Sequence, residues 1–500
     1  MAAGNDRGAR VKGPDRNKAE KAWIVGPEPQ DIFSIPPSER EESQSPAPPL
    51  IAIARLEMLV ANPRLFRVAQ SILPEPAPGS PGRPARHPRY IYLVVLCCIA
   101  IFRSTRLACA NLQHPAYWKI VKEAVRQHLG DAAADALPDT GPTVDQWNDQ
   151  AAYLRAAAEE LRAASRDAWI EQAQDQGLLA NSRKGTLVRP HRSQVITGDG
   201  TVTKPPSSQT EAVAVDKRTG AIRYHRVDPD AGVQVEGGGT ETFGNKVVAF
   251  ATRWPGKPHS RVFLNCGTAR HRSVDVDPER EAEAGAAVQL MHEIRDIIPD
   301  AGLTVAFDTA WRGVHRSQLI KRGILVFTPH HDGLEPRPFE RYVCARTTHK
   351  LFAVIGRTCE RQRTVDGKDF YSQLPVVDLE YRYSGTSCRI YHVVQIPCGS
   401  QVHVMRIPVY ETRADQKIDP RTRRMVFNRT EYLRIIPPET DAGRRLLGFR
   451  QDSESGNSNL DLSFRLERMP VYGSVGALLT FIGFAWVANS IALSLGHHDG

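Results

Sequence analysis

Two features that classify many proteins, a secretion signal and a C-x-x-C cysteine pair, are missing from this sequence of 500 residues. Its N-terminal segment is polar and basic, and it lacks the apolar core of a secretion signal. Its eight cysteines are scattered and include no C-x-x-C pair. An early apolar run, at residues 92–102, is too short to cross a bilayer. These absences argue against a secreted, disulfide-stapled protein, and we expect reduced thiols in an intracellular compartment.

Four of the cysteines fall in one region and raise the question of zinc. They are Cys344, Cys359, Cys388 and Cys398. Their spacing matches no usual pattern of zinc ligands, so we interpret them as buried free thiols. The sequence leaves open whether any of them binds zinc.

One apolar run is long enough to require an interpretation. Residues 475–495 carry no charge and have about the length of a membrane helix. The run contains Gly483, Asn489 and Ser490, and we interpret it as a buried helix that covers one face of a sheet. This predicts no membrane partner. The alternative is a membrane-associated protein that is anchored by this segment.

The composition is that of a soluble globular protein with a basic balance. Hydrophobic residues make up 41% and charged residues 24% of the chain, which is too long for a single core. The net charge of +9 favours a polyanionic partner, of which nucleic acid is the commonest.

Changes in pattern along the chain divide it into four parts. We expect a disordered tail rich in charge and proline at 1–50, a helical domain at 51–190, an α/β core at 191–335 and 440–500, and a β-rich insertion at 336–439. In the helical part, Thr143 is a suitable cap for one long helix over 143–178. Basic residues around this part predict DNA binding: Arg83, Arg86, Arg89, Arg183, Lys184, Arg189 and Arg192.

The α/β core has the element order of a ribonuclease H-like fold. The pattern predicts a strand at 193–196 that ends at 198–200, a hairpin of 212–215 with 221–227, a strand at 245–251, a helix after Pro278, a strand at 303–307, a helix at 316–321 and a strand at 324–327. The fold class is therefore an α/β ribonuclease H-like core with an all-β insertion, preceded by an α-helical N-terminal domain.

Two aspartates end strands that are neighbours in such a sheet. Asp199 ends the first strand and Asp308 the fourth, so their carboxylates should converge. Two carboxylates with a third from a helix can hold two divalent ions that promote in-line attack on phosphorus. The alternative for each aspartate alone is a turn-forming or capping role.

Four sequence blocks resemble those of the DDE transposases of bacterial insertion sequences. They are GDGT at 198–201, GNK at 244–246, AFDTAWRG at 306–313 and FRQDSESGNSNLD at 449–461. The resemblance covers most of residues 85–495. Two positions depart from it, because Leu447 and Asp461 stand where the family often has Tyr and Lys.

The resemblance implies an enzyme that cleaves DNA at insertion-sequence ends and transfers the strands. Asp199, Asp308 and Glu454 would be catalytic and would hold two Mg²⁺ ions, with Mn²⁺ able to substitute. DNA-binding roles would fall to four further residues: Lys246, Trp311, Arg312 and Arg450. The partners would be the double-stranded DNA of the terminal repeats and of the target, bound by a homodimer, and the localisation a bacterial cytoplasm with nucleoid association. The alternative is a catalytically inactive, transposase-derived DNA-binding protein.

Single residues keep structural alternatives. Trp311 after a strand is a candidate core residue as well as a platform for an unpaired base. Arg450 could form a plain salt bridge, and Lys246 could be a surface lysine. We prefer Glu454 to Asp452 as the third ligand because only Glu454 shares a helix face with Arg450, four residues earlier.

Overall fold

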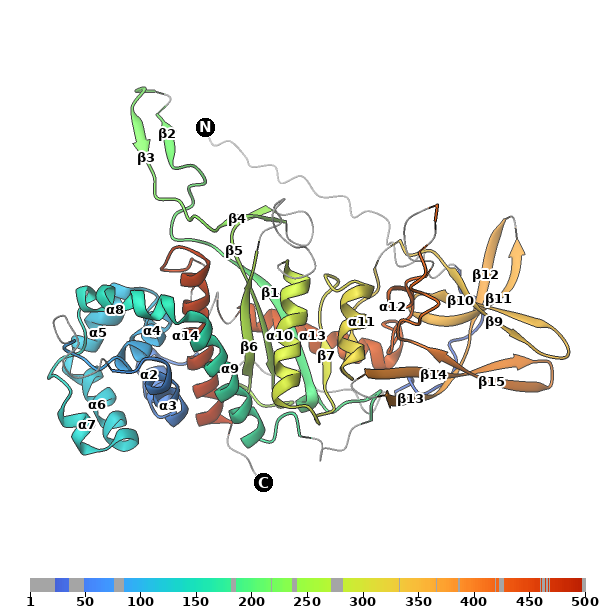
Figure 1. Cartoon of the computed structure of the whole chain (residues 1–500), viewed down its shortest axis with the longest axis horizontal. Helices are drawn as coiled ribbons and strands as arrows, with labels where there is room; N and C mark the ends of the chain where they lie inside the picture. Colours follow the sequence, from blue (N-terminus) through green and yellow to red (C-terminus); the bar gives the residue numbers. More distant parts are fainter. Residues whose placement is uncertain are drawn as a thin grey trace, which may run out of the picture. The chain divides into compact units, whose positions relative to one another are not determined.

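The computed structural model divides into two compact units. It describes residues 23–35, 49–75, 85–180, 186–216, 218–235, 241–270, 282–331, 333–365, 367–384, 387–418, 420–421, 427–458, 460, 464, 466 and 468–496. The helix–sheet unit comprises Glu39–Ala310, Arg322–Val326 and Gly448–Gly500. The β-rich unit comprises Met1–Ser38, Trp311–Lys321 and Phe327–Leu447 (Figure 1).

The first part of the helix–sheet unit is helical, as the sequence predicts. Its helices are α2 (Ala52–Val60), α3 (Pro63–Ile72), α4 (Ile91–Phe102), α5 (Thr105–Gln113), α6 (Pro115–Leu129), α7 (Asp131–Asp135), α8 (Val144–Ala156) and α9 (Ala158–Asp175). The single helix predicted over 143–178 is wrong, because the chain leaves helical geometry at Ala157. Thr143 does cap α8, and its hydroxyl accepts a hydrogen bond from Gln146 N at 3.2 Å.

The sheet of this unit is mixed. Its strands are β1 (Val195–Thr203), β4 (Gly232–Val235), β5 (Glu241–Thr252), β6 (Val262–Ala269), β7 (Thr304–Ala306) and β8 (Leu325–Phe327), in the order β4-β5-β1-β7-β8 with β6 also paired to β5. β1 pairs antiparallel with β5 and parallel with β7. The predicted hairpin consists of β2 (Val213–Val215) and β3 (Ile222–Tyr224), which pair with each other in a separate two-stranded sheet.

Two strand predictions need correction. β1 does not end at residues 198–200 but continues through them to Thr203, so Asp199 lies inside the strand. β4 and β6 were not predicted. β6 pairs antiparallel with β5, so that β1, β5 and β6 are the three long strands of the sheet. The helix predicted to follow Pro278 is α10 (Glu283–Ile297), and Pro278 itself lies outside the described residues.

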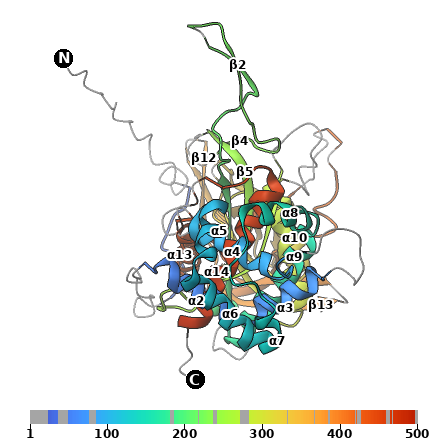
Figure 2. The ribbon, with the colours of Figure 1, turned by 90° about the vertical axis from the view of Figure 1, so that its left-hand side faces the viewer.

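The apolar C-terminal run forms α14 (Ser474–Leu495), which packs against β5 and β6 of the sheet. It also packs against the helices α2, α4 and α9 (Figure 2). The packing is close, because a Cβ atom at Gly483 would lie 2.9 Å from Leu96 O of α4. The polar side chains of α14 are also paired. Asn489 accepts a hydrogen bond from Phe263 N at 2.7 Å and donates one to Phe263 O at 2.9 Å. The structure therefore buries this run, as the sequence predicts.

Among the described residues, α14 is the one single helix that is long and apolar enough to cross a membrane, and 83% of its most apolar window is buried inside the protein. The helices α4 and α5 meet the same criterion only if they are joined across a bend of 113°. The helices share one hydrophobic core with β5 and β6 of the sheet, which extends from Leu56 of α2 to Phe263 of β6 and Trp486 of α14. The predicted boundary at residue 190 therefore does not separate two cores.

The β-rich unit contains two antiparallel sheets. One has the order β12-β11-β10-β9 and is built from β9 (Arg337–Val343), β10 (Thr348–Val354), β11 (Arg357–Val365) and β12 (Lys368–Gln373). The other has the order β13-β14-β15 and is built from β13 (Val376–Ser384), β14 (Ser387–Cys398) and β15 (Gln401–Pro408). The helices α11 (Gly313–Lys321) and α12 (Arg429–Tyr432) belong to the same unit. Residues 336–439 contain the strands β9–β15, as the sequence predicts, and also the short helix α12, which the sequence analysis did not predict.

Part of the predicted N-terminal tail is ordered on this unit. Ile24 forms a bridge to Tyr371 of β12, and Phe33 is fully buried. Asp31 forms an ion pair with the buried Arg357. The prediction of disorder for residues 1–50 is therefore wrong for 23–35, because these apolar side chains and one carboxylate complete the packing of the β-rich unit.

Candidate active site

Asp199 and Asp308 lie near the ends of the pairing between two neighbouring parallel strands, β1 and β7. The last paired residues of β1 and β7 are Thr197 and Ala306. Asp199 lies two residues further on within β1, and Asp308 lies two residues beyond the end of β7. The charge of Asp308 acts on Asp199, so the two carboxylates lie near each other. Both side chains are partly buried.

The glycines on either side of Asp199 are required by their surroundings. A Cβ atom at Gly198 would collide with the ring of Phe250 on β5, and one at Gly200 would collide with the carboxylate of Glu283. The Phe250 ring in turn stacks on Phe307 with a centroid distance of 5.6 Å. The Gly-Asp-Gly sequence thus lets an aromatic ring and a second acidic side chain approach the strand that carries Asp199.

Glu283 is a carboxylate of this site that the sequence analysis missed. It is the first residue of α10, where the partial positive charge of a helix N-terminus favours an acidic side chain. Its carboxylate forms an ion pair with Lys246 of β5. Both side chains are largely buried, with 19% and 16% of their surface exposed. Lys246, predicted to contact DNA, is therefore engaged by an acid of the same unit.

The electrostatics of the site indicate mutual repulsion among its acids. Burial, followed by the charges of Asp308 and Glu283, raises the pKa of Asp199 to about 6, and Arg450 opposes this rise. Burial also raises the pKa of Glu283, against the effect of Lys246. Because the charge of Asp308 contributes to the raised pKa of both Asp199 and Glu283, the three carboxylates form a set of hard oxygen donors that a divalent cation would neutralise.

The helix α13 (Asp441–Ser458) contributes Arg450 to the same site, since Arg450 lies close enough to Asp199 to lower its pKa. Glu454 lies four residues later in α13, on the face of the helix that carries Arg450. The side chains of Glu454 and Asp452 lie outside the described residues, as does all of Asp461. The choice of Glu454 as a ligand stays a prediction.

The two predicted DNA-binding residues after Asp308 belong to the β-rich unit. Trp311 has no exposed surface, so its ring is not available to stack on a base, and the core role is the one observed. Arg312 is half-exposed and forms an ion pair with Glu431 at 2.7 Å.

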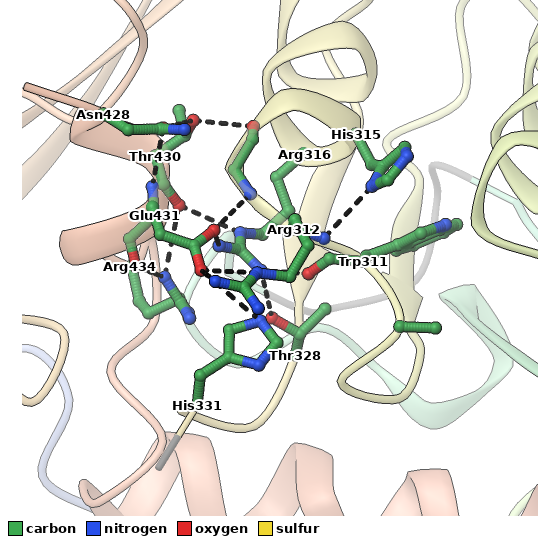
Figure 3. A network of polar contacts seen from close by, with 12 residues as sticks. Trp311, Arg312, His315, Arg316, Thr328, His331, Asn428, Thr430, Glu431 and Arg434 are labelled. Atoms are coloured by element: carbon green, nitrogen blue, oxygen red, sulfur yellow. Dashed lines mark hydrogen bonds and ion pairs between the residues drawn. The ribbon is translucent and has the colours of Figure 1, made fainter. Parts of the chain in front are cut away.

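Glu431 of α12 is the centre of a buried polar network (Figure 3). Its carboxylate accepts hydrogen bonds from Arg312 Nε at 2.7 Å, from Arg316 Nη2 at 2.8 Å and from Gly313 N. Arg316 also donates to Thr430 O at 2.9 Å. The network fixes the start of α11 and the direction of the side chain of Arg312, a residue of the AFDTAWRG block at 306–313.

The basic residues around the helical part are only partly available for DNA. Arg192 is buried, donates to Val195 O at 2.9 Å and lies over the ring of Phe449. Its predicted role in phosphate binding is therefore wrong in this structure, because the buried guanidinium binds the backbone at the start of β1 and contacts the Phe449 ring. Arg86 is exposed, whereas Arg83, Arg183 and Lys184 lie outside the described residues.

Comparison of the chain with models of known protein families, with curated proteins and with solved structures finds no match.

Proposed function

We propose that this chain is a metal-dependent DNA strand-cleaving and strand-transferring enzyme of the DDE transposase class, with a ribonuclease H-like core. One observation carries the proposal: Asp199 and Asp308 each lie two residues beyond the last paired residues of the neighbouring parallel strands β1 and β7, and Asp308 helps to raise the pKa of Asp199. The strand order β4-β5-β1-β7-β8, with β6 also paired to β5, supports such a core, since β1 is antiparallel to β5 and parallel to β7 and β5 is antiparallel to β6.

The donor set fits divalent Mg²⁺, with Mn²⁺ as a substitute. Asp199 and Asp308 would hold two ions with Glu454, and the bound ions would activate a water or a 3′-hydroxyl and stabilise the leaving oxygen. The chain's own residues would orient these groups. Arg450, near Asp199, would hold a carboxylate or a phosphate, and the ion pair with Glu283 would orient the side chain of Lys246.

Plasmid nicking tests the proposal. The substrate is a supercoiled plasmid that carries the gene of this chain with its flanking DNA, incubated with the full chain and Mg²⁺. Asp199→Asn and Asp308→Asn should each abolish nicking and retain DNA binding, because removing one charged ligand disrupts both ion sites. The matched control is Asp167→Asn, an exposed acid of α9 that pairs with Arg166 and should keep full activity. Nicking by both site variants at the unmutated rate would refute the proposal.

The third ligand is tested separately. Glu454→Gln should abolish cleavage while DNA binding persists, and Asp452→Asn should leave most activity. Glu283→Gln should reduce cleavage less than Glu454→Gln, because the charge of Glu283 is already neutralised by Lys246. If Glu283→Gln alone abolishes cleavage, the third ligand is on α10 instead of α13.

The alternative function is a catalytically inactive, transposase-derived DNA-binding protein. The same assay separates the two. If the unmutated chain binds the plasmid and does not nick it with Mg²⁺ or Mn²⁺, the alternative holds and the acids have only a structural role. The partners of the active enzyme would be the terminal repeats and target DNA, bound by a homodimer.

A further inference from the structure

Two β-hairpins of the β-rich unit carry the same pair of side chains at the same spacing. In the β9–β10 hairpin, Cys344 follows β9 and His349 is the second residue of β10. In the β14–β15 hairpin, Cys398 ends β14 and His403 is the third residue of β15. The sequence of each turn is thus Cys, four other residues, then His: CARTTH and CGSQVH. The first hairpin belongs to the four-stranded sheet and the second to the three-stranded sheet.

The fold brings these four side chains together. One potential ligand atom from each residue lies within 4.8 Å of the others. Cys344 Sγ is 3.8 Å from Cys398 Sγ and 3.8 Å from His349 Nε2. Around a tetrahedral zinc ion with normal bond lengths, two sulfur atoms lie about 3.8 Å apart, and a sulfur and a nitrogen about 3.6 Å apart. The separations of Cys344 from Cys398 and from His349 are therefore close to those that zinc requires, and His403 lies within 4.8 Å of these three ligand atoms.

The surroundings orient these groups as ligands. His349 Nδ1 lies 2.7 Å from a carboxylate oxygen of Glu360 on β11, which leaves Nε2 directed toward Cys344. A carboxylate behind a ligand imidazole is the usual arrangement at protein zinc sites. The amide of Thr347 donates to Cys344 Sγ at 3.4 Å. His403 Nε2 is buried and has no hydrogen-bond partner within the described part of the chain.

A disulfide does not account for the arrangement. The separation of 3.8 Å between Cys344 Sγ and Cys398 Sγ is far from the bonded length of about 2.05 Å. A disulfide would also give no role to two histidines at matched positions. Two thiols with two imidazoles form a set that suits zinc, whereas Mg²⁺ selects oxygen ligands. The cluster is thus chemically different from the carboxylates of the candidate active site.

We propose that Cys344, His349, Cys398 and His403 form a structural zinc site that joins the tips of the β9–β10 and β14–β15 hairpins. Four protein ligands close the coordination sphere, so the site stabilises the fold and does not bind substrate. Its effect is to tie the two sheets of the β-rich unit to each other. The inference does not depend on the proposed DNA-cleaving activity.

Metal content and cobalt spectroscopy of the full chain test the proposal. The chain purified without chelator should contain one zinc per molecule, measured by mass spectrometry. After replacement by Co²⁺, it should show thiolate-to-cobalt absorption in the near ultraviolet and the intense visible bands of a tetrahedral site, and one equivalent of Zn²⁺ should remove both. A folded wild-type chain that binds Co²⁺ with only the weak spectrum of an octahedral site would overturn the proposal.

Variants separate these ligands from other groups. Cys344→Ser and His403→Gln should each lose the tetrahedral spectrum, and Glu360→Gln should weaken zinc binding about 10–100-fold. Cys359→Ala is the matched control, since Cys359 is a buried free thiol of the same unit and should retain the metal. Asp199→Asn should also retain it. Because Glu360→Gln leaves all four ligands in place, an unchanged zinc affinity in that variant would contradict the proposed orientation of His349.

Discussion

At the residue scale, the carboxylate of Asp199 links stability to pH. Burial, together with Asp308, raises the pKa of Asp199 to about 6 in the folded chain. The metal-free folded state therefore holds this proton more tightly than the unfolded chain does. The contribution of Asp199 to stability is present at low pH and is lost as the pH rises from about 4 to about 6, by on the order of 2 kcal/mol.

This loss should be measurable by urea unfolding of the chelator-treated chain. Raising the pH from 5 to 7.5 should destabilise the helix–sheet unit of the wild type more than that of Asp199→Asn, which lacks the titrating group. At pH 7.5, Mg²⁺ should stabilise the wild type and have little effect on Asp199→Asn. Equal pH responses of the two proteins would show that the repulsion at Asp199 is absent.

A second residue-scale prediction concerns Glu431. Its side chain is 7% exposed and compensates the charge of Arg316, whose side chain is 2% exposed. Glu431→Gln leaves that buried guanidinium without a counter-charge, so the β-rich unit should lose about 3–5 kcal/mol of unfolding free energy. Glu380→Gln is the control, because Glu380 pairs with exposed arginines and should change the denaturation midpoint little.

The sequence indicated part of the candidate site and missed part of it for physical reasons. Asp199 and Asp308 could be found because each follows a short apolar run in the sequence and lies in a Gly-rich or turn-like segment. Glu283 could not, because only the pairing of β5 with β1 and the start of α10 bring it beside Gly200. The proximity of Cys344 to Cys398 could not be predicted either, because it depends on how two separate hairpins pack against each other.

At the element scale, local patterns identified most helices and failed where tertiary contacts decide. The break at Ala157 contains neither Gly nor Pro, so nothing in the local sequence marks it. β1 runs through two glycines that usually end a strand, because the Phe250 ring and Glu283 occupy the space beside them. β6 lacks the alternation of a half-exposed strand, since it is buried on both faces.

The contact of α14 with β6 gives a prediction for a single element. Asn489 satisfies both the amide and the carbonyl of Phe263. Asn489→Leu leaves these two buried groups unpaired and should cost at least about 2 kcal/mol of unfolding free energy. Val475→Ala, at the half-exposed start of the same helix, is the control and should have a small effect. A urea midpoint of Asn489→Leu equal to that of the control would contradict this role.

At the scale of the whole molecule, the two units should respond to acid in opposite directions. Burial lowers the pKa of His392 to about 4, while its Nε2 lies 2.8 Å from Ile435 O. Burial, followed by the charge of Arg434, lowers the pKa of His330 to about 3. Because the unfolded chain protonates these histidines first, the β-rich unit loses stability as the pH falls from about 6.5 toward 4.

Calorimetry of the chelator-treated chain at pH 7 and pH 5 should therefore show two transitions whose spacing changes. The transition of the β-rich unit should move to lower temperature at pH 5, whereas the Asp199 contribution moves the other transition upward. His392→Gln should reduce the acid shift of the first transition only. A single transition with one pH dependence would show that the two units unfold together.

The hydrogen bonds of Asn489 have a further consequence, which concerns association between chains. An open strand edge offers unpaired amides and carbonyls on which a strand from another molecule can add. Among the strands that the structure describes, β6 pairs with β5 alone, and Asn489 of α14 binds the backbone amide and carbonyl of Phe263 in β6. The C-terminal helix thus blocks the addition of a strand from another molecule to β6. A chain truncated before Ser474 should form β-rich aggregates through β6.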